Sequence, residues 1–405
     1  MIATFLGGGR EVGRVGIFLE IENKKILIDY GISPQNPPVY PIESPPVKDV
    51  ILSHAHLDHS GMIPWICRRY NTRVFSTKLT REISQILFYD TLKIADASGY
   101  PFPYDMNDIE IANQNFFDVE KKIFIDDDIE INLYPAGHIP GSTMIKINDS
   151  LFACDINTIE TRLLHGVKPV KCRNLFIEGT YAGVDHPDRI ELEKKFIDDV
   201  EDVVNNGGKA IIPAFALGRT QEIAMILAER EKEVWVDGMG YQISEIFLEN
   251  GKYIKSPQKL KKAIEKINFV YSNQGKKLAL KAGIVITTSG MMNGGPVLWY
   301  IDKIKDDPKS AVFISGYQVE GTNGRRLLDN KEIDLYGVVR KVNCQVKFYD
   351  FSAHAGHSQL VKFINECSPE NIIIFHSEKP ELLAEEIEAN TYIPKNGEKI
   401  EIGGD

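Results

Sequence analysis

The chain has 405 residues, of which 43% are hydrophobic and 26% are charged, and its formal net charge is −10. This composition is typical of soluble globular proteins, and the length exceeds what one hydrophobic core usually supports, so we expect two domains. We expect no membrane association, because the first residues lack the basic start of a targeting signal and no apolar run is long enough to span a bilayer. The five cysteines are scattered and form no C-x-x-C pair, as in proteins of a reducing cytoplasm. The negative charge gives no support to a nucleic-acid partner, although whole-chain charge reports solubility more than the chemistry of a site.

Short apolar strands dominate the first part of the chain. Their pattern predicts strands at residues 2–6, 15–21, 25–29, 50–53, 73–76, 129–135, 142–147, 151–154 and 175–178, with helices at 61–70 and 78–95. The glycine-rich segment 7–13 lacks the G-x-G-x-x-G spacing and no helix follows it. It is therefore predicted to be a loop between two strands and not a dinucleotide site.

From about residue 185 the pattern changes to alternating strands and helices. Helices are predicted at 190–205 and 219–230, and strands at 209–213, 233–237, 283–288, 311–315 and 345–351. This alternation is typical of a parallel sheet covered by helices. A helix at 356–367, a strand at 371–376 and a helix at 379–389 are predicted to follow.

The strongest local signal is the segment SHAHLDHSG at residues 53–61, which lies between a predicted strand and a predicted helix. On such a tight loop, His54 and His56 are alternate residues that can point to one metal ion, and Asp58 and His59 can then turn toward a second. Zinc favours imidazole ligands together with a carboxylate, and a catalytic zinc keeps one position open for water. A histidine-rich loop without function would rarely hold four ligand-type side chains within six residues.

Three further candidate ligands lie at the ends of predicted strands. His138 stands in a turn between two strands, Asp155 follows the strand at 151–154, and His376 ends the strand at 371–376. Each alone would be interpreted as a turn or capping residue. Together they supply a third histidine, a carboxylate that bridges two metals, and a ligand that closes the second site. The adjacent Cys154 is interpreted as a buried structural thiol and not as a ligand.

These motifs resemble the β-CASP branch of the metallo-β-lactamase superfamily over essentially the whole chain. The closest resemblance is to the nuclease subunit of the cleavage and polyadenylation specificity factor and its short archaeal homologues. The segment LIDYG at 27–31 is similar to the family's first motif, whose aspartate, here Asp29, orients the metal loop from outside the ligand shell. The metal loop is similar to the second motif, His138 to the third and Asp155 to the fourth.

Three motifs specific to β-CASP proteins are also recognisable. Glu178 in EGTY resembles the acidic motif, His354 in FSAHAGH the second, and His376 in FHSE the third. A histidine in the third motif goes with RNA-processing members, whereas the DNA-repair branch usually has valine. Segments 213–222, 288–292 and 316–322, with Leu57 and the Ser-Gly pair at 60–61, favour the cleavage-factor branch over RNase J.

The resemblance implies an α/β fold: a metallo-β-lactamase αββα sandwich with an inserted β-CASP domain, which is a parallel sheet flanked by helices. The lactamase domain would comprise residues 1–184 and 346–405, and the β-CASP domain residues 185–345. Three local departures from the family pattern do not remove a ligand. These are Ala153-Cys154 for the usual Thr-Gly, Gly356-His357 for Ala-Asp, and Ser377 for Gly.

The function that the resemblance implies is zinc-dependent endoribonuclease activity on single-stranded RNA, in RNA processing or decay, which leaves 5′-phosphate and 3′-hydroxyl ends. Two zinc ions per chain are expected. The first would be held by His54, His56, His138 and Asp155, and the second by Asp58, His59, Asp155 and His376. Asp58 would also hold the proton of the attacking hydroxide, His354 would protonate the leaving 3′-oxygen, and Glu178 would orient His354.

The inserted domain is expected to cover the site and to hold the RNA backbone. Candidate phosphate contacts are Arg219, Gly290, Arg325 and Arg326. Relatives suggest a homodimer to which residues 392–405 contribute.

Two alternatives remain open, a 5′-3′ exoribonuclease of the RNase J type and a non-catalytic subunit of an RNA-processing complex. A small-molecule hydrolase would explain the zinc loop but not residues 185–345.

Overall fold

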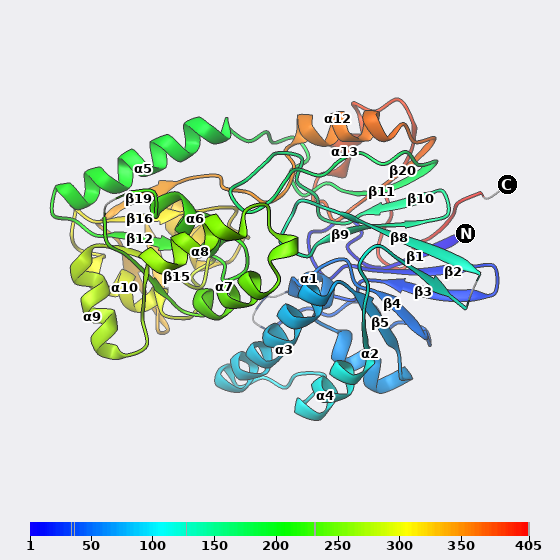
Figure 1. The fold of residues 1–405 in the computed structure, drawn as a ribbon, viewed down its shortest axis with the longest axis horizontal. Helices are drawn as coiled ribbons and strands as arrows, with labels where there is room; N and C mark the ends of the chain where they lie inside the picture. Colours follow the sequence, from blue (N-terminus) through cyan, green and yellow to red (C-terminus); the bar gives the residue numbers. More distant parts are fainter. Residues whose placement is uncertain (34, 36, 127, 231, 404–405) are drawn as a thin grey trace. The chain divides into compact units, whose positions relative to one another are not determined.

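The computed structural model describes residues 1–33, 35, 37–126, 128–230 and 232–403, and its chain divides into two compact units (Figure 1). Unit 1 consists of Met1–Glu160, His165–Asp185 and Ala353–Asp405, and unit 2 of Thr161–Leu164 and His186–Ser352. The last two residues of the expected C-terminal part, Gly404 and Asp405, lie outside the described residues.

Unit 1 contains two seven-stranded sheets. The first has the order β22 (Lys399–Glu401), β1 (Ile2–Gly7), β2 (Gly16–Ile21), β3 (Lys24–Ile28), β4 (Asp49–Ile51), β5 (Arg73–Ser76), β6 (Phe116–Asp118). The second has the order β21 (Asn390–Tyr392), β20 (Asn371–Phe375), β11 (Asn174–Glu178), β10 (Ser150–Ala153), β9 (Thr143–Ile147), β8 (Ile129–Pro135), β7 (Lys122–Ile125). In each sheet four neighbouring strands run parallel, β3 to β6 in the first and β21, β20, β11 and β10 in the second.

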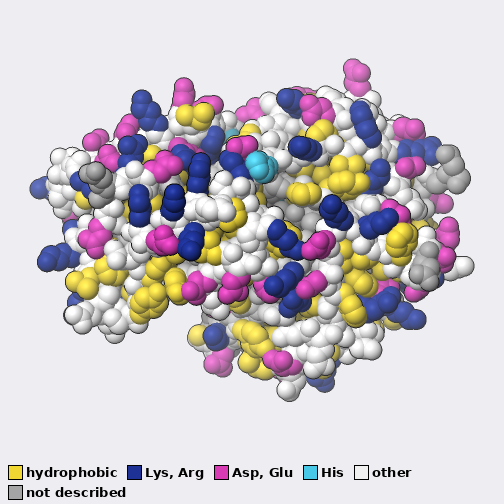
Figure 2. Space-filling model, in the orientation of Figure 1, with side chains coloured by type: hydrophobic (Ala, Val, Ile, Leu, Met, Phe, Trp, Pro, Cys, Tyr) yellow, Lys and Arg dark blue, Asp and Glu magenta, His cyan; other side chains and the backbone are white. Residues whose placement is uncertain are grey.

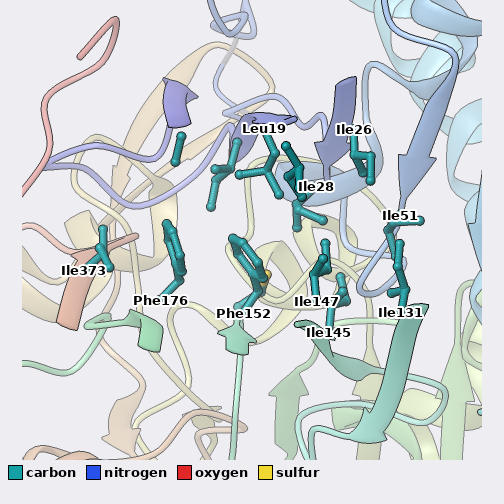
Figure 3. Packing of buried hydrophobic residues seen from close by; sticks show 14 of the residues in the cluster. Leu19, Ile26, Ile28, Ile51, Ile131, Ile145, Ile147, Phe152, Phe176 and Ile373 are labelled. Atoms are coloured by element: carbon teal, nitrogen blue, oxygen red, sulfur yellow. The ribbon is translucent and has the colours of Figure 1, made fainter. Parts of the chain in front are cut away.

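The two sheets of unit 1 pack face to face on one hydrophobic core (Figure 3). Alternate residues of β2 and β3, such as Leu19 and Ile28, meet inward residues of the second sheet, such as Ile145 and Phe176. Phe152 stacks on Phe176 with ring centroids 4.2 Å apart. This alternation is the period-2 pattern from which the strands were predicted, because successive side chains of a strand point to opposite faces.

Helices cover the outer faces of both sheets. The first sheet packs on α2 (Ile63–Tyr70), α3 (Lys78–Ser98) and α4 (Met106–Asn115), and the second on α12 (His357–Cys367) and α13 (Pro380–Ala384). The start of α3 is capped by Thr77, whose hydroxyl accepts from the N–H of Thr80, and Asp105 forms a capping box at α4. Unit 1 is thus an αββα sandwich, which confirms the predicted fold class.

Unit 2 is built on a six-stranded parallel sheet. Its order is β14 (Asn268–Phe269), β13 (Val234–Asp237), β15 (Ile284–Thr287), β12 (Ala210–Pro213), β16 (Ala311–Ile314), β19 (Gln345–Phe348). One face packs on α5 (Arg189–Asn205) and α6 (Arg219–Leu227), and the other on α9 (Asn273–Ala282), α10 (Val297–Ile304) and α11 (Asn323–Asn330). The remaining elements are α7 (Gly240–Glu249), α8 (Pro257–Lys266), a 3-10 turn (Gly251–Tyr253) and the hairpin of β17 (Glu332–Leu335) and β18 (Val338–Lys341). The parallel sheet flanked by helices is the one expected from the sequence.

Two of the differences from the sequence-based expectation lie in the C-terminal part of the chain. The helix expected at 379–389 was wrong in length, because α13 ends at Ala384 and the chain turns back so that β21 pairs in parallel with β20. The strand beginning at Gln345 pairs with β16 and belongs to unit 2, so unit 2 extends to Ser352, beyond the expected boundary at residue 345.

The surface carries charge of both signs. On the face drawn in Figure 2, basic and acidic side chains are interspersed, so the net charge of −10 does not take the form of one acidic patch there. Among the residues that the structure describes, no helix is long and apolar enough to cross a bilayer.

Candidate metal centre

The candidate site lies at one end of the second sheet of unit 1, where the parallel strands β10, β11 and β20 finish. Asp155 comes two residues after β10, Glu178 is the last residue of β11, and His376 directly follows β20. Neighbouring parallel strands bring their carboxyl ends to the same edge of a sheet, which is where α/β folds usually place ligands. The pairing of β10, β11 and β20 brings Asp155, Glu178 and His376 together, although the three residues lie far apart in the sequence.

The metal loop follows β4 and runs into the short helix α1 (Leu57–Ser60). Its backbone is hydrogen-bonded to residues that flank β2 and β3: Asp58 O accepts from the N–H of Val15 at 2.7 Å, and His59 O accepts from the N–H of Tyr30 at 2.7 Å. This approach requires a glycine at position 31, because a Cβ on Gly31 would lie 1.8 Å from Asp58 O. The LIDYG motif thus supports the metal loop through backbone hydrogen bonds and the close approach at Gly31.

Asp29 is fully buried and anchors the loop from below. Its carboxylate accepts from the backbone N–H of Ser53, from the hydroxyl of Ser53 and from Nδ1 of His59, each at 2.7 Å. The last bond fixes the tautomer of His59, so its Nε2 is the atom that faces the cluster. Asp29 adopts a positive φ of 55°, an uncommon conformation for a non-glycine residue that the surrounding bonds maintain.

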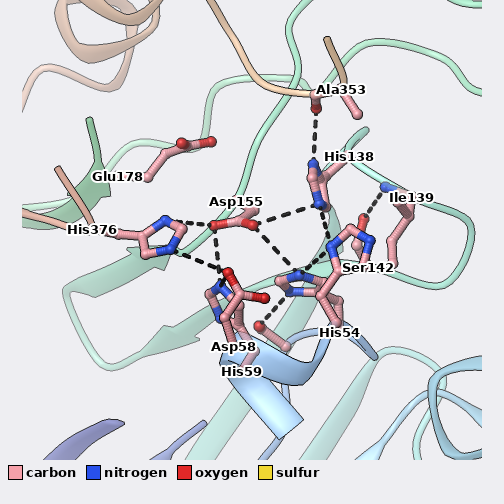
Figure 4. A network of polar contacts seen from close by, with 12 residues as sticks. His54, Asp58, His59, His138, Ile139, Ser142, Asp155, Glu178, Ala353 and His376 are labelled. Atoms are coloured by element: carbon pink, nitrogen blue, oxygen red, sulfur yellow. Dashed lines mark hydrogen bonds and ion pairs between the residues drawn. The ribbon is translucent and has the colours of Figure 1, made fainter. Parts of the chain in front are cut away.

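All seven expected ligands come together in unit 1, around the carboxylate of Asp155 (Figure 4). The ligand atoms of His54, His56, His138 and Asp155 all lie within 4.8 Å of one another, and Asp155 forms a second group with His59 and His376. Its Oδ2 lies 3.4 Å from Nε2 of His54 and 3.5 Å from Nε2 of His138. Its Oδ1 lies 3.3 Å from Nε2 of His59 and from Nδ1 of His376.

Asp58 stands beside the second of these groups. Its Oδ2 lies 3.4 Å from Nε2 of His376 and 4.0 Å from Nε2 of His59. Asp58 forms a further possible ligand group with His54 and His59. One carboxylate oxygen of Asp155 thus faces each histidine group, which is the arrangement that a bridging ligand requires.

The donor atoms suit zinc. Burial lowers the pKa of His54 and His138 well below the usual value and that of His56 to about 4, so these imidazoles are neutral and present lone pairs near pH 7. Burial also acts to lower the pKa of His59 and His376. The adjacent carboxylates, Asp155 foremost, have the larger effect, so both pKa values are raised above the usual value. The carboxylates therefore attract positive charge to this side of the cluster.

Three buried atoms without a hydrogen bond support the same conclusion. His59 Nε2, Asp155 Oδ1 and His376 Nε2 are buried and make no hydrogen bond among the described residues. A buried polar atom without a partner costs on the order of 1–3 kcal/mol, and a coordinated cation would remove that cost. The residues present therefore fit the metal that the motif predicts.

His354 and Glu178 form a pair at the edge of the cluster. Nδ1 of His354 donates to Oε2 of the fully buried Glu178 at 2.8 Å, and Glu178 Oε1 also accepts from the N–H of Ile156. Nε2 of His354 lies 3.9 Å from Oδ2 of Asp155. Burial alone would lower the pKa of His354, but Glu178 and Asp155 raise it above its usual value. The imidazole thus points its other nitrogen toward the ligand cluster.

The candidate RNA contacts are all in unit 2 and are not part of the cluster. Arg219 begins α6, and its guanidinium donates to Ser315 O. Gly290 follows β15, Arg325 pairs with Asp329 on α11, and Arg326 is the next residue of that helix.

Four groups that support the site were given no role of their own in the sequence-based assignment. Ser53 O–H bonds Asp29, Ala353 O accepts from Nδ1 of His138 at 2.9 Å, and Gly8 O accepts from the N–H of His376 at 2.6 Å. Thr180 Oγ1 lies 3.3 Å from Nδ1 of His376. Two of the four act through backbone carbonyls, which every residue type has, so residue type alone gave no signal for them. Cys154 is buried, and burial raises the pKa of its thiol well above the usual value.

Comparisons with known proteins agree with this geometry. The metallo-β-lactamase superfamily matches residues 11–204, the β-CASP domain residues 220–327, and the Zn-dependent metallo-hydrolase RNA specificity domain residues 339–396. The chain is 35% identical to RNase aCSPSF2 of Saccharolobus solfataricus, over 98% of this chain and 84% of the relative. It belongs to the β-CASP family of the metallo-β-lactamase superfamily.

Other β-CASP relatives span most of the chain. It is 34% identical to Probable RNase MJ4 of Methanocaldococcus jannaschii, over 99% of this chain and all of the relative. It is 31% identical to the transcription termination factor FttA of the same organism, over 98% of this chain and 71% of the relative. A crystal structure of a protein of unknown function from Enterococcus faecalis superposes with a TM-score of 0.64 at 17% identity, over 98% of this chain and 99% of that one, which shows the fold alone.

The family assignment settles the type of enzyme. The segment matched by the Zn-dependent metallo-hydrolase RNA specificity domain contains His354 and the candidate ligand His376. The segment matched by the lactamase superfamily contains the six other candidate ligands. The protein is accordingly a zinc-dependent metallo-hydrolase of the β-CASP ribonuclease type.

Proposed function

We propose that this β-CASP protein is an endoribonuclease that cuts single-stranded RNA with two zinc ions per chain and leaves 5′-phosphate and 3′-hydroxyl ends. The observation that carries the proposal is the position of Asp155. One carboxylate oxygen faces the His54–His138 group, the other faces the His59–His376 group, and His354 stands beside them.

The first zinc would be held by His54, His56, His138 and Asp155, and the second by Asp58, His59, Asp155 and His376. When bound, a zinc pair lowers the pKa of a water molecule and offsets charge on the scissile phosphate. This chemistry matches what phosphodiester hydrolysis needs at neutral pH.

The chain's own side chains would then handle two protons. Besides binding the second zinc, Asp58 would hold the proton of the attacking water by accepting its hydrogen bond, because its side chain is 24% exposed and can meet water. Nε2 of His354 would donate a proton to the leaving 3′-oxygen. Glu178 would hold Nδ1–H and thereby keep Nε2 directed at the reacting group.

RNA is the proposed substrate for two reasons. The third β-CASP motif has His376, as in RNA-processing members of the family, and two of the relatives described above are named as RNases. Arg219, Arg325 and Arg326 and the backbone at Gly290 would contact phosphates. A cytoplasmic location belongs to the same proposal, because all five cysteines are buried free thiols.

Exonucleolytic 5′-3′ cleavage is the second candidate. A protein named RNase J-like protein from Methanocaldococcus jannaschii is 30% identical over 98% of this chain. A non-catalytic role in a processing complex is disfavoured, because every ligand position and the His354–Glu178 pair are filled.

We expect the zinc-loaded protein to cut single-stranded RNA faster than DNA of the same sequence, and a chelator to abolish cleavage. RNA labelled at either end, with 5′-triphosphate, 5′-monophosphate and 5′-hydroxyl forms compared, distinguishes the two modes. Internal fragments from all three forms support endonuclease action, whereas mononucleotides from the monophosphate form alone support the exonuclease. Metal analysis showing no zinc, together with full activity in chelator, would overturn the proposal.

We also propose a homodimer to which the C-terminal segment, residues 392–405, contributes. The terminal strand β22 lies at the edge of the first sheet of unit 1, beside β1, and its outer side pairs with no described strand. Light scattering should give twice the 45.6 kDa mass of one chain. A truncation after residue 391 that leaves the mass doubled would exclude this segment from the interface.

A further inference from the structure

Two loops meet at the carboxyl edge of the parallel sheet in unit 2. They follow β12 and β16, which are direct neighbours in parallel register. Phe215 comes two residues after the end of β12, and Tyr317 three residues after the end of β16. Because neighbouring strands lie about 4.8 Å apart, the two loops adjoin at the edge where open α/β sheets usually bind ligands.

Both rings are exposed although the residues below them are buried. Phe215 is 36% exposed and Tyr317 40%, whereas Ala214 and Ile314 are fully buried. One exposed aromatic residue is unremarkable in a folded protein, but two on adjoining loops at the ligand end of a sheet indicate a contact surface.

The position of Phe215 depends on a glycine in the third loop, which follows β15 on the other side of β12. A Cβ on Gly290 would lie 3.1 Å from the ring of Phe215 and 3.0 Å from its backbone nitrogen. A side chain at position 290 would therefore displace the ring. Gly290 is also the residue whose backbone is proposed above to contact phosphate, and its lack of a side chain leaves room for Phe215.

Positive charge accompanies the rings. The guanidinium of Arg219 is held at Ser315 O, two residues before Tyr317, and it would lie 2.5 Å from a Cβ on Gly316. The pKa of Arg325 is raised above its usual value, mainly by Asp329 and to a lesser degree by Tyr317. Arg325 therefore lies close to the Tyr317 phenol. Asp329 and Glu320 reduce the local charge around Arg325, so Arg219 is the stronger candidate for a phosphate contact.

We propose that Phe215 and Tyr317 form a stacking platform for bases of single-stranded RNA, with Arg219 beside it for the backbone phosphate. The proposal rests on the ribonuclease function proposed above and deepens it. Single-stranded RNA presents unstacked bases that aromatic side chains can cover, and every base has a face for stacking, so binding here would depend little on sequence.

The test measures binding and not cleavage. Fluorescence anisotropy of a labelled single-stranded RNA is recorded with zinc-loaded protein in a His354→Ala background, and repeated on chelator-treated protein, so that hydrolysis does not consume the probe. Phe215→Ala and Tyr317→Ala should each raise Kd by roughly 5- to 100-fold, from the usual contribution of one stacked base. Tyr317→Phe should bind like the parent, because it keeps the ring.

Two further variants separate stacking from other effects. Phe215→Leu keeps an apolar side chain but lacks the flat ring, so it should bind as weakly as Phe215→Ala. Tyr336→Ala removes another exposed aromatic residue of unit 2, which is 69% exposed on the β17–β18 hairpin, and should leave Kd unchanged. Thermal unfolding of each variant checks that the fold is retained.

The outcomes distinguish this inference from the proposed function. If the parent binds RNA and both alanine variants bind equally well, or if Phe215→Leu binds like the parent, the platform is wrong and the ribonuclease proposal stands. If the parent does not bind RNA at all, the proposed function itself fails.

Discussion

Asp155→Asn should remove both zinc ions and with them all cleavage of RNA. The substitution keeps the size of the side chain but replaces the carboxylate whose two oxygens face the two histidine groups. Neutral carboxamide oxygen is a poor zinc ligand, and the amide would place an N–H₂ donor against imidazole nitrogens. We therefore expect metal analysis to fall from about two zinc ions per chain toward none, and cleavage to fall to background.

Asp149→Asn is the matched control. Asp149 is exposed at the opposite end of the strand that leads to Asp155, and no described contact joins its side chain to the cluster. This variant should keep its zinc and its activity. An Asp155→Asn protein that retains both zinc ions and cleaves RNA would show that the carboxylate does not bridge the metals.

His354→Ala should separate chemistry from metal binding. His354 reaches the cluster through Nε2, 3.9 Å from Asp155, but it is not one of the proposed ligands. We expect both zinc ions to remain and RNA affinity to change little, whereas single-turnover cleavage should fall by roughly 10²- to 10⁴-fold, the usual contribution of a positioned general acid. RNA with a leaving group that needs no protonation, such as a 3′-bridging thiol, should recover much of the lost rate.

His357→Ala provides the comparison within the same motif. His357 accepts from the N–H of Gly183 and pairs with Glu386, so it faces away from the ligand cluster. Its removal should lower the unfolding temperature but change the rate of cleavage little. Loss of zinc in parallel with activity in His354→Ala would mean that this residue is a ligand, and near-normal turnover would mean that it serves only to hold Glu178.

The sequence by itself was sufficient for the metal loop and for the order of most strands. Four ligand-type residues within six positions constitute a local signal that no tertiary contact is needed to detect. The period-2 alternation of strands such as β8, predicted at its exact bounds, is equally local, because it depends only on which residues face the core.

Elements whose limits depend on distant partners were predicted less well. The segment after α13 is rich in helix-forming residues, yet it leaves the helix because β21 must pair with β20. The sequence of the strand that begins at Gln345 does not indicate which unit it belongs to. Its pairing with β16 places it in unit 2. Pairing energy gained far along the chain outweighs local helix propensity, which amounts to less than about 1 kcal/mol per residue.

The candidate ligands could be named from sequence, partly through a family resemblance, but their meeting could not. His138, Asp155 and His376 are separated by up to 238 positions (376 − 138), and they converge because the β8–β9 turn and the ends of β10 and β20 share one edge of a sheet. Tertiary structure alone decided the roles of the carbonyls of Gly8 and Ala353, the close approach at Gly31 and the exposure of the rings of Phe215 and Tyr317. Residue type determines the chemistry of a side chain. The atoms that the side chain contacts depend on where the backbone places it, and that is fixed only when the chain has folded.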